Sequence, residues 1–217
     1  INRDMVSAID IGPTILDILN INIPAHFEGT SFNQKTNPLS PQYVFGQFDE
    51  NAGGIPRPSR TVISKQYGYV FNAWATGQYE FKSASSSHTS YKVMKRFSEI
   101  DDNIKQRFEF WKYRQIEELY DYKNDPHALN NLVDDPNYQL VVEELRKVLK
   151  KQMQNTQDYV LEAFSHRDDV IFLNRWMDNQ IKQAKKRTQT LRWKRSQNSS
   201  GSTKQNNKLY QKPKYTN

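Results

Sequence analysis

The sequence contains no cysteine among its 217 residues. This absence excludes disulfide bonds and thiolate metal sites, but it does not identify a compartment, because many exported bacterial proteins also lack cysteine. No window approaches the roughly 18 consecutive apolar residues that a membrane-spanning helix needs, so we predict no span. The chain starts at Ile1 without methionine, and its first residues do not form a signal peptide. We therefore expect it to be the interior of a longer protein.

Histidine is also scarce, with four residues scattered along the chain. The four histidines are too far apart to give the local spacing of metal ligands, such as i, i+4. From this pattern we predict no metal ligand and no catalytic residue in the chain. The serine-rich stretch from Ser83 to Ser90 is predicted to be a surface loop, because no partner acid is identifiable for a serine nucleophile.

Acidic residues are absent from Ile181 to Asn217, where eleven basic residues occur. The whole chain has 31 basic and 24 acidic residues, so the part before this tail is mildly acidic. After about Arg195 the composition becomes polar and cannot bury enough surface to offset the entropy of ordering, which predicts disorder. Two interpretations of the tail stay open, a solvated terminal extension and a polyanion-binding arm.

The segment from Glu118 to Pro136 reads ELYDYKNDPHALNNLVDDP and has the densest turn punctuation in the sequence. Residues Ile116 to Tyr122 form a short apolar and aromatic run that predicts a strand. Asp125-Pro126 and Asp135-Pro136 each place a side-chain acceptor before a fixed φ, which favours the start of a helix or helical turn. The pattern predicts a strand, a turn, a short helix, a second turn and a long helix.

Apolar periodicity predicts further helices. Two short helices or one bent helix are expected from Tyr91 to Tyr113, and helix is also expected from Asp158 to Thr188. At the other end, Val6 to Ile11 is predicted as a strand, followed by a helix with Pro13 in its first turn. On the long helix after Pro136, the predicted apolar face consists of Leu140, Val141, Leu145, Val148 and Leu149.

The ELYD string and the two Asp-Pro pairs that follow it resemble the closing signature of the sulfatases, particularly the heparan N-sulfatase (sulfamidase) branch. Two other blocks are similar to the same family: VSAIDIGPTILDIL, which begins at Val6, and VFGQFDENAGGIPRPSRTVISKQYGYVFNAW, from Val44 to Trp74. The resemblance covers roughly Val6 to Phe164. One small departure is Ala128, at a position where the family often carries an acid.

The resemblance implies an α+β fold, the C-terminal subdomain of a sulfatase. In it, a small antiparallel sheet packed by a long C-terminal helix leans on a larger alkaline-phosphatase-like α/β domain. We expect residues 1–40 to end that large domain and form a linker, and residues 41–165 to form the subdomain. Residues 166–195 are then a helical extension, and residues 196–217 a disordered basic tail.

For the full-length enzyme, the resemblance implies bound calcium, a formylglycine nucleophile and hydrolysis of a sulfate ester or N-sulfate on a sulfated glycan. Those groups are expected in a catalytic domain upstream of Ile1. Residues Pro56 to Arg60 read PRPSR and are similar to the C/S-x-P-S-R motif of the nucleophile, but proline cannot be oxidised to the aldehyde. The chain alone is therefore expected to be inert. The family also implies a periplasmic or secreted location, or a lysosomal one in a eukaryote.

Asp49, Glu50 and Arg60 are the candidates for contact with a substrate sugar or its sulfate. The resemblance implies that the loop from Gln47 to Asn51 faces the mouth of the active site, and an arginine suits bidentate contact with an oxyanion. An equal alternative is that Arg60 pairs with a neighbouring carboxylate and holds two strands together. The family has a histidine in this loop and this chain has none, which places the transfer of substrate specificity in doubt.

Two other functions compete with the sulfatase interpretation. The first is a polyanion-binding module, for nucleic acid or a sulfated polysaccharide, that acts through the basic tail. The second is another member of the alkaline-phosphatase-like superfamily that acts on a phosphate or phosphonate.

Overall fold

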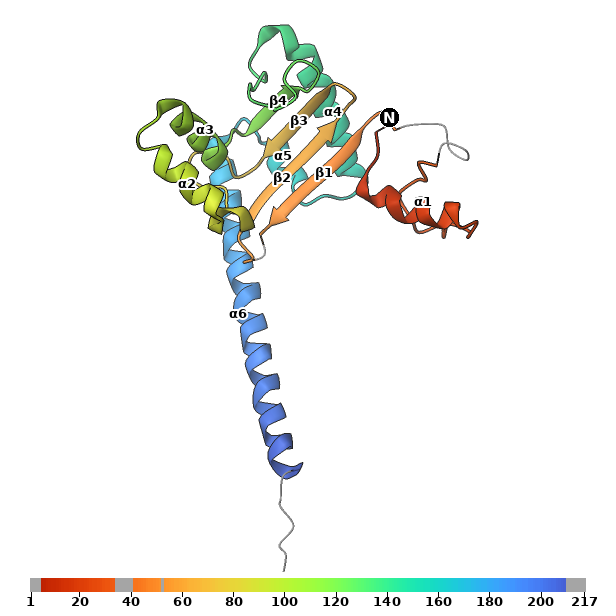
Figure 1. Cartoon of the computed structure of the whole chain (residues 1–217), viewed down its shortest axis with the longest axis vertical. Coiled ribbons are helices and arrows are strands. Elements are labelled where there is room, and N and C mark those ends of the chain that lie inside the picture. Colours follow the sequence, from red (N-terminus) through yellow and green to blue (C-terminus); the bar gives the residue numbers. More distant parts are fainter. Residues whose placement is uncertain (1–4, 34–40, 52, 210–217) are drawn as a thin grey trace, which may run out of the picture.

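A four-stranded antiparallel sheet forms the centre of the molecule (Figure 1). The computed structural model describes residues 5–33, 41–51 and 53–209. The strands follow one another in the sheet in the order β1-β2-β3-β4, so each pairs with its neighbour in sequence. The predicted α+β fold with a small antiparallel sheet is confirmed. The strands are β1 (Val44–Glu50), β2 (Pro56–Ile63), β3 (Tyr67–Asn72) and β4 (Glu117–Asp121).

The alternation of side chains along the strands creates two different faces. On one face, Val62, Tyr69, Phe71 and Leu119 are completely buried and form the centre of the hydrophobic core. Gly68 lies on the other face, where a Cβ would come within 2.5 Å of the Tyr122 hydroxyl. Only glycine therefore fits at this position while the tyrosine keeps its place.

Helices from the C-terminal third cover the core face. The first turn, η3 (Pro136–Tyr138), begins at Asp135, whose Oδ1 accepts a hydrogen bond of 2.9 Å from the amide of Asn137. This confirms the predicted role of the second Asp-Pro pair. The chain continues into α4 (Gln139–Asn155), α5 (Leu161–Ser165) and α6 (Val170–Leu209).

The long helix α4 packs on β2 and β3, but its apolar face differs slightly from the predicted one. Leu140 is 83% exposed, and Val141 and Val148 are partly buried at the margin of the core. The buried face of α4 is therefore rotated relative to the predicted one, because two sets of apolar residues at helical spacing overlap in this sequence. The fully buried positions are Val142, Leu145, Leu149 and Met153.

Beyond the edge of the sheet, the chain between β3 and β4 forms a helical layer. It contains η2 (Ala84–Ser87), α2 (Thr89–Phe97) and α3 (Asp102–Tyr113). Asp101 caps α3 by accepting hydrogen bonds from the amides of Asn103 and Ile104. Of the two expected alternatives, two short helices or one bent helix, the structure has the two short helices.

The N-terminal segment lies beside the β1 edge of the sheet (Figure 1). The predicted strand from Val6 to Ile11 is wrong, since the structure has η1 (Ala8–Asp10) and then α1 (Ile11–Ile18). The carboxylate of Asp10 accepts bonds from the amides of Ser7, at 2.8 Å, and Thr30, at 2.9 Å. These bonds close a local turn in place of an extended strand. The carboxylate of Asp10 therefore fixes this turn.

Helix α6 has 40 residues and extends away from the sheet (Figure 1). Its backbone continues as helix to Leu209, past the point near Arg195 where disorder was expected. The side chains of residues 192–209 and the whole of 210–217 lie outside the described part of the chain, so the disordered basic tail (196–217) stays a prediction. The expected domain boundaries likewise stay a prediction. No helix among the described residues is long and apolar enough to cross a membrane.

Candidate functional site

Arg60 is the most heavily bonded of the three candidate residues. It projects from β2 toward the loop between α4 and α5, and is only 4% exposed. Its Nε and Nη2 donate to both carboxylate oxygens of Asp158, at 2.5 and 3.0 Å. Nη2 also donates to Asp49 Oδ1 at 2.8 Å. The guanidinium thus already makes a bidentate contact with carboxylate, and it ties two strands to a distant loop.

Asp49 occupies an irregular point in the sheet. The pairing of β1 with β2 shifts between Phe48 and Glu50, so that Arg57 and Pro58 lie opposite this one residue. Such a bulge tolerates Pro58, which has no N–H to donate to the hydrogen-bond ladder between the strands. It also redirects the side chains beside it. The carboxylate of Asp49 then accepts bonds from Arg60, as above, and from the hydroxyl of Tyr159 at 3.0 Å.

A groove of about 650 Å³ contains both candidate carboxylates but not Arg60. Glu50 forms an ion pair with Arg187 of α6 across the groove. Tyr159 stacks on Trp176 with ring centroids 6.0 Å apart and planes 14° apart. Burial and the neighbouring Asp49 raise the pKa of Tyr159, so its hydroxyl stays protonated and donates. The groove is lined by Asp49, Glu50, Pro56, Tyr159, Glu162, Trp176, Gln180, Gln183 and Arg187.

The opposite face of the sheet has a second hollow, of about 290 Å³. Phe81 lines this hollow, stacked on Trp74 at 5.6 Å and in edge contact with Trp111 at 5.5 Å. We call this hollow the aromatic pocket. It is lined by Phe48, Ser59, Asn72, Trp74, Phe81, Trp111 and Arg114.

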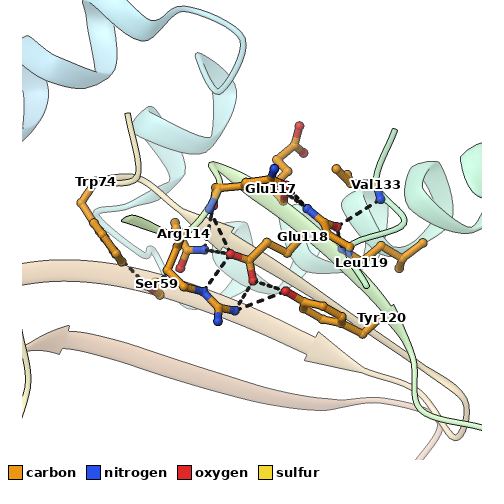
Figure 2. A network of polar contacts seen from close by, with 11 residues as sticks. Ser59, Trp74, Arg114, Glu117, Glu118, Leu119, Tyr120 and Val133 are labelled. Atoms are coloured by element: carbon orange, nitrogen blue, oxygen red, sulfur yellow. Dashed lines mark hydrogen bonds and ion pairs between the residues drawn. The ribbon is translucent and has the colours of Figure 1, made fainter. Parts of the chain in front are cut away.

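A buried carboxylate lies behind the aromatic pocket (Figure 2). Glu118 of β4 is completely buried and accepts hydrogen bonds from the guanidinium of Arg114 through Nε, at 2.9 Å, and Nη2. It also accepts from the hydroxyl of Tyr120, at 2.9 Å, and from Asn72 Nδ2, at 3.2 Å. Burial and this carboxylate raise the pKa of Tyr120. Both carboxylate oxygens of Glu118 therefore accept hydrogen bonds from the protein.

The network continues from Asn72 to the wall of the pocket. Ser59 donates its hydroxyl to Asn72 Oδ1 at 2.7 Å and accepts from Trp74 Nε1 at 3.2 Å. Figure 2 shows these contacts beside the Arg114 guanidinium. The pocket therefore combines aromatic walls with polar groups whose positions are fixed by hydrogen bonds.

Sequence reasoning placed Glu118 in a family signature and did not single out Arg114 as a functional residue. The signal that was present is the alternation in β4: Glu118 and Tyr120 fall on the same face of a strand whose other residues are apolar or paired. An acid at such a position needs a cation. The nearest upstream cation is Arg114, four residues earlier.

The calcium and formylglycine that the resemblance implies do not fit the residues present. The described residues contain no group of three or more His, Asp or Glu side chains that could hold a metal ion. The PRPSR string lies in β2, where Arg57 donates from Nε to the carbonyl of Glu80 at 2.5 Å and stacks over Tyr79. That string is therefore a structural strand, and no catalytic step is derived through either group.

Comparison with known proteins tests the resemblance. No family model matches the sequence. The chain is 27% identical over 152 residues to an ulvan-active sulfatase of Formosa agariphila, which covers 68% of this chain and 25% of the relative. It is 26% identical over 176 residues to N-sulphoglucosamine sulphohydrolase of Homo sapiens, which covers 73% of this chain and 34% of the relative. The resemblance to the sulfatases, a class of hydrolases, is confirmed.

The second of these relatives also bears out the resemblance to the sulfamidase branch. Among solved structures, a 2-O GAG sulfatase overlaps with a TM-score of 0.45 at 23% identity, covering 69% of this chain and 25% of that one. The chain spans about a quarter to a third of the length of its curated relatives.

Proposed function

We propose that this chain is the C-terminal part of a sulfatase that hydrolyses a sulfate ester or sulfamate on a sulfated glycan. The observation that carries the proposal is similarity to sulfatases over more than two thirds of the chain. The catalytic domain, with its calcium and formylglycine, is then supplied by sequence upstream of Ile1. In this proposal the protein works in the periplasm or after secretion, or in the lysosome of a eukaryote.

The surface of the N-terminal segment supports a missing partner domain. Soluble monomers rarely expose large contiguous apolar patches, yet residues 5–33 expose many large apolar side chains. Covering them would remove a substantial apolar area from water, which stabilises an interface by about 25 cal/mol per Å². The exposed side chains are Val6, Ile9, Ile11, Ile15, Ile18, Leu19, Ile21, Phe27 and Phe32.

We assign Asp49 and Glu50 as contacts to the sugar hydroxyls of the glycan. Both carboxylates line the groove beside the exposed ring of Tyr159, and an aromatic ring next to hydrogen-bonding groups suits a polyol ring with one apolar face. Arg60, the third candidate, then acts through Asp49, because its guanidinium fixes that carboxylate.

Sulfate release tests the proposal. The purified 217-residue chain is expected to release no sulfate from an aryl sulfate or from N-sulfated glucosamine. The same chain extended upstream in its gene is expected to contain a C-x-P-S-R or S-x-P-S-R sequence and to release sulfate. Release by the short chain would contradict the assignment of the nucleophile to the upstream domain. An inactive extended protein without that motif would contradict the sulfatase proposal itself.

The second candidate function, polyanion binding through the basic tail, has one supporting observation. Lys182, Lys185 and Lys186 are exposed on α6, the helix that extends away from the sheet (Figure 1). Their spacing of three and four residues places them on one side of a helix. Neutralising phosphates or sulfates with such a stripe gives affinity that falls steeply with salt.

Charge reversal on two helices tests this second candidate. Heparin affinity of the triple variant Lys182→Glu, Lys185→Glu, Lys186→Glu is expected to fall at least tenfold, with a smaller salt slope. The matched control changes Lys147, Lys150 and Lys151 of α4 to Glu, which alters the net charge equally. If both triple variants lose the same affinity, binding depends on net charge and the tail has no specific role.

A further inference from the structure

The aromatic pocket has the construction of a ligand site. Its walls are rings of Phe48, Phe81 and Trp111 that are only partly buried, together with the buried ring of Trp74. A small-molecule site usually combines such apolar walls with a few fixed polar groups. Its volume of about 290 Å³ lies just below the usual range for ligand sites, which starts at about 300 Å³. That volume accommodates one ring rather than an oligomer.

Arg114 supplies the polar end of the pocket. Its backbone has φ 52° and ψ −170°, a conformation that side chains rarely adopt and that costs on the order of 1–3 kcal/mol. This conformation ends α3 and allows the guanidinium to reach Glu118 and to stack over Phe110 at 4.7 Å. Nε and Nη2 are used by Glu118 and Tyr120. Within the described part of the chain, Nη1 has no hydrogen-bond acceptor.

The electrostatics of the pocket differ from those of the basic tail. Glu118 lies behind Arg114 and offsets its charge, so the pocket attracts no anion over a long range. What remains is a fixed N–H donor at the edge of an aromatic cavity. Such a group recognises an acceptor by direct hydrogen bonding at short range, and this recognition depends little on salt.

We propose that the aromatic pocket binds a single pyranose ring that carries an anionic substituent. The apolar face of the ring packs on Phe81 and Trp111, and the sulfate or carboxylate accepts a hydrogen bond from Arg114 Nη1. The choice of a sugar as the ligand rests on the proposed function. The site itself rests on the geometry of the pocket, which lies on the opposite face of the sheet from the groove of Asp49 and Glu50.

Binding of monosaccharides to the 217-residue chain tests the proposal. The probes are N-sulfoglucosamine and N-acetylglucosamine, a matched pair with and without an anion, followed by NMR line broadening of the sugar and by tryptophan fluorescence. We expect saturable binding of N-sulfoglucosamine, with an affinity that changes less than twofold between 50 and 200 mM salt. N-acetylglucosamine is expected to bind several-fold more weakly.

Two variants distinguish the lining of the pocket from the residues that pack behind it. Trp111→Ala removes a wall and is expected to weaken binding of N-sulfoglucosamine at least tenfold. Tyr91→Ala removes the ring that contacts Trp111 from outside the pocket lining and is expected to change binding less than threefold. Equal losses in the two variants, or binding that survives Trp111→Ala, would overturn the proposal. So would the absence of saturable binding.

Two outcomes distinguish this proposal from the function proposed above. If Asp49→Asn and Glu50→Gln weaken binding of the sugar and Trp111→Ala does not, the sugar lies in the groove. The pocket proposal then fails while the glycan assignment stands. If the pocket binds the anionic sugar but the upstream-extended protein releases no sulfate, the sulfatase proposal fails and the pocket remains.

Discussion

Arg60 and Asp158 are separated by 98 residues in sequence, and their side chains form two hydrogen bonds, of 2.5 and 3.0 Å. Both side chains are at most 10% exposed. Burial lowers the pKa of Arg60, but hydrogen bonding to Asp158 and Asp49 outweighs it and the pKa is raised, so the guanidinium stays charged in the folded protein. It connects the middle of the sheet to the loop that leads from α4 into α5.

Removing Asp158 is expected to destabilise the fold. Asp158→Ala leaves a buried guanidinium with Asp49 as its remaining acid, and loss of one partner of a buried pair costs about 3 kcal/mol or more in unfolding free energy. Urea denaturation measures the loss. The control is Asp168→Ala, whose carboxylate is 80% exposed and 3.6 Å from Arg167, and which is expected to change stability by less than about 0.5 kcal/mol. Similar losses in both variants would contradict a buried, specific contact.

Removing one partner of the Arg114–Glu118 pair is expected to lower the unfolding free energy more than removing both partners. Glu118→Leu alone leaves Arg114 without its carboxylate, and Arg114→Leu alone leaves Glu118 as a completely buried charge. The double variant removes both charges and should be more stable than Arg114→Leu by at least about 1 kcal/mol. A double-mutant cycle by chemical denaturation gives this coupling. Strictly additive losses would show that the two side chains act independently.

Acid stability should depend on Asp121. Burial alone would raise the pKa of this carboxyl, but hydrogen bonds from Gln66 and Asn124 outweigh it, and the pKa is lowered. A lowered folded-state pKa stabilises the protein above the unfolded value of about 3.9, and that stability is lost as the pH falls through the folded-state value. Between pH 5 and pH 2, the wild type should therefore lose more unfolding free energy than Asp121→Asn. Parallel stability curves for the two proteins would rule out this contribution.

Gly68→Ala is expected to destabilise the sheet by about 1–3 kcal/mol, because the added Cβ overlaps the ring of Tyr122. The measurement is thermal or urea unfolding. The companion variant Tyr122→Ala removes the obstacle, and in that background the alanine at position 68 should cost less than about 1 kcal/mol. A cost that is unchanged in the Tyr122→Ala background would point to the backbone of β3 rather than to the tyrosine.

Local signals in the sequence predicted much of the fold. Asp135 before Pro136 fixed the start of the terminal helices, because one side chain and one dihedral angle decide that geometry. The apolar and aromatic run from Ile116 to Tyr122 likewise located strand β4. The register of α4 failed at Leu140, because LVVEELRKVL contains two overlapping apolar stripes and only the sheet decides between them.

The candidate site was less predictable from the sequence. Asp49 and Glu50 share a groove, but Tyr159, Trp176 and Arg187, which complete it, come from parts of the chain more than 100 residues away. The resemblance offered no clue to the partner of Arg60, since Asp158 lies beyond the next two strands and α4. The aromatic pocket depends on the positive φ of Arg114, and an arginine in the sequence does not predict this backbone conformation.

Helix α6 sets a distance between the groove and its own C-terminal end. From Arg187, which pairs with Glu50 at the groove, the helix continues to Leu209, a distance of about 33 Å at 1.5 Å per residue. A polymer shorter than this cannot touch the groove and the far end of the helix at the same time. A longer one can, and its second contact becomes intramolecular, with a high effective concentration. If the chain binds a polyanion through its basic tail, as the second candidate function proposes, long anionic polymers should therefore bind more tightly than short ones.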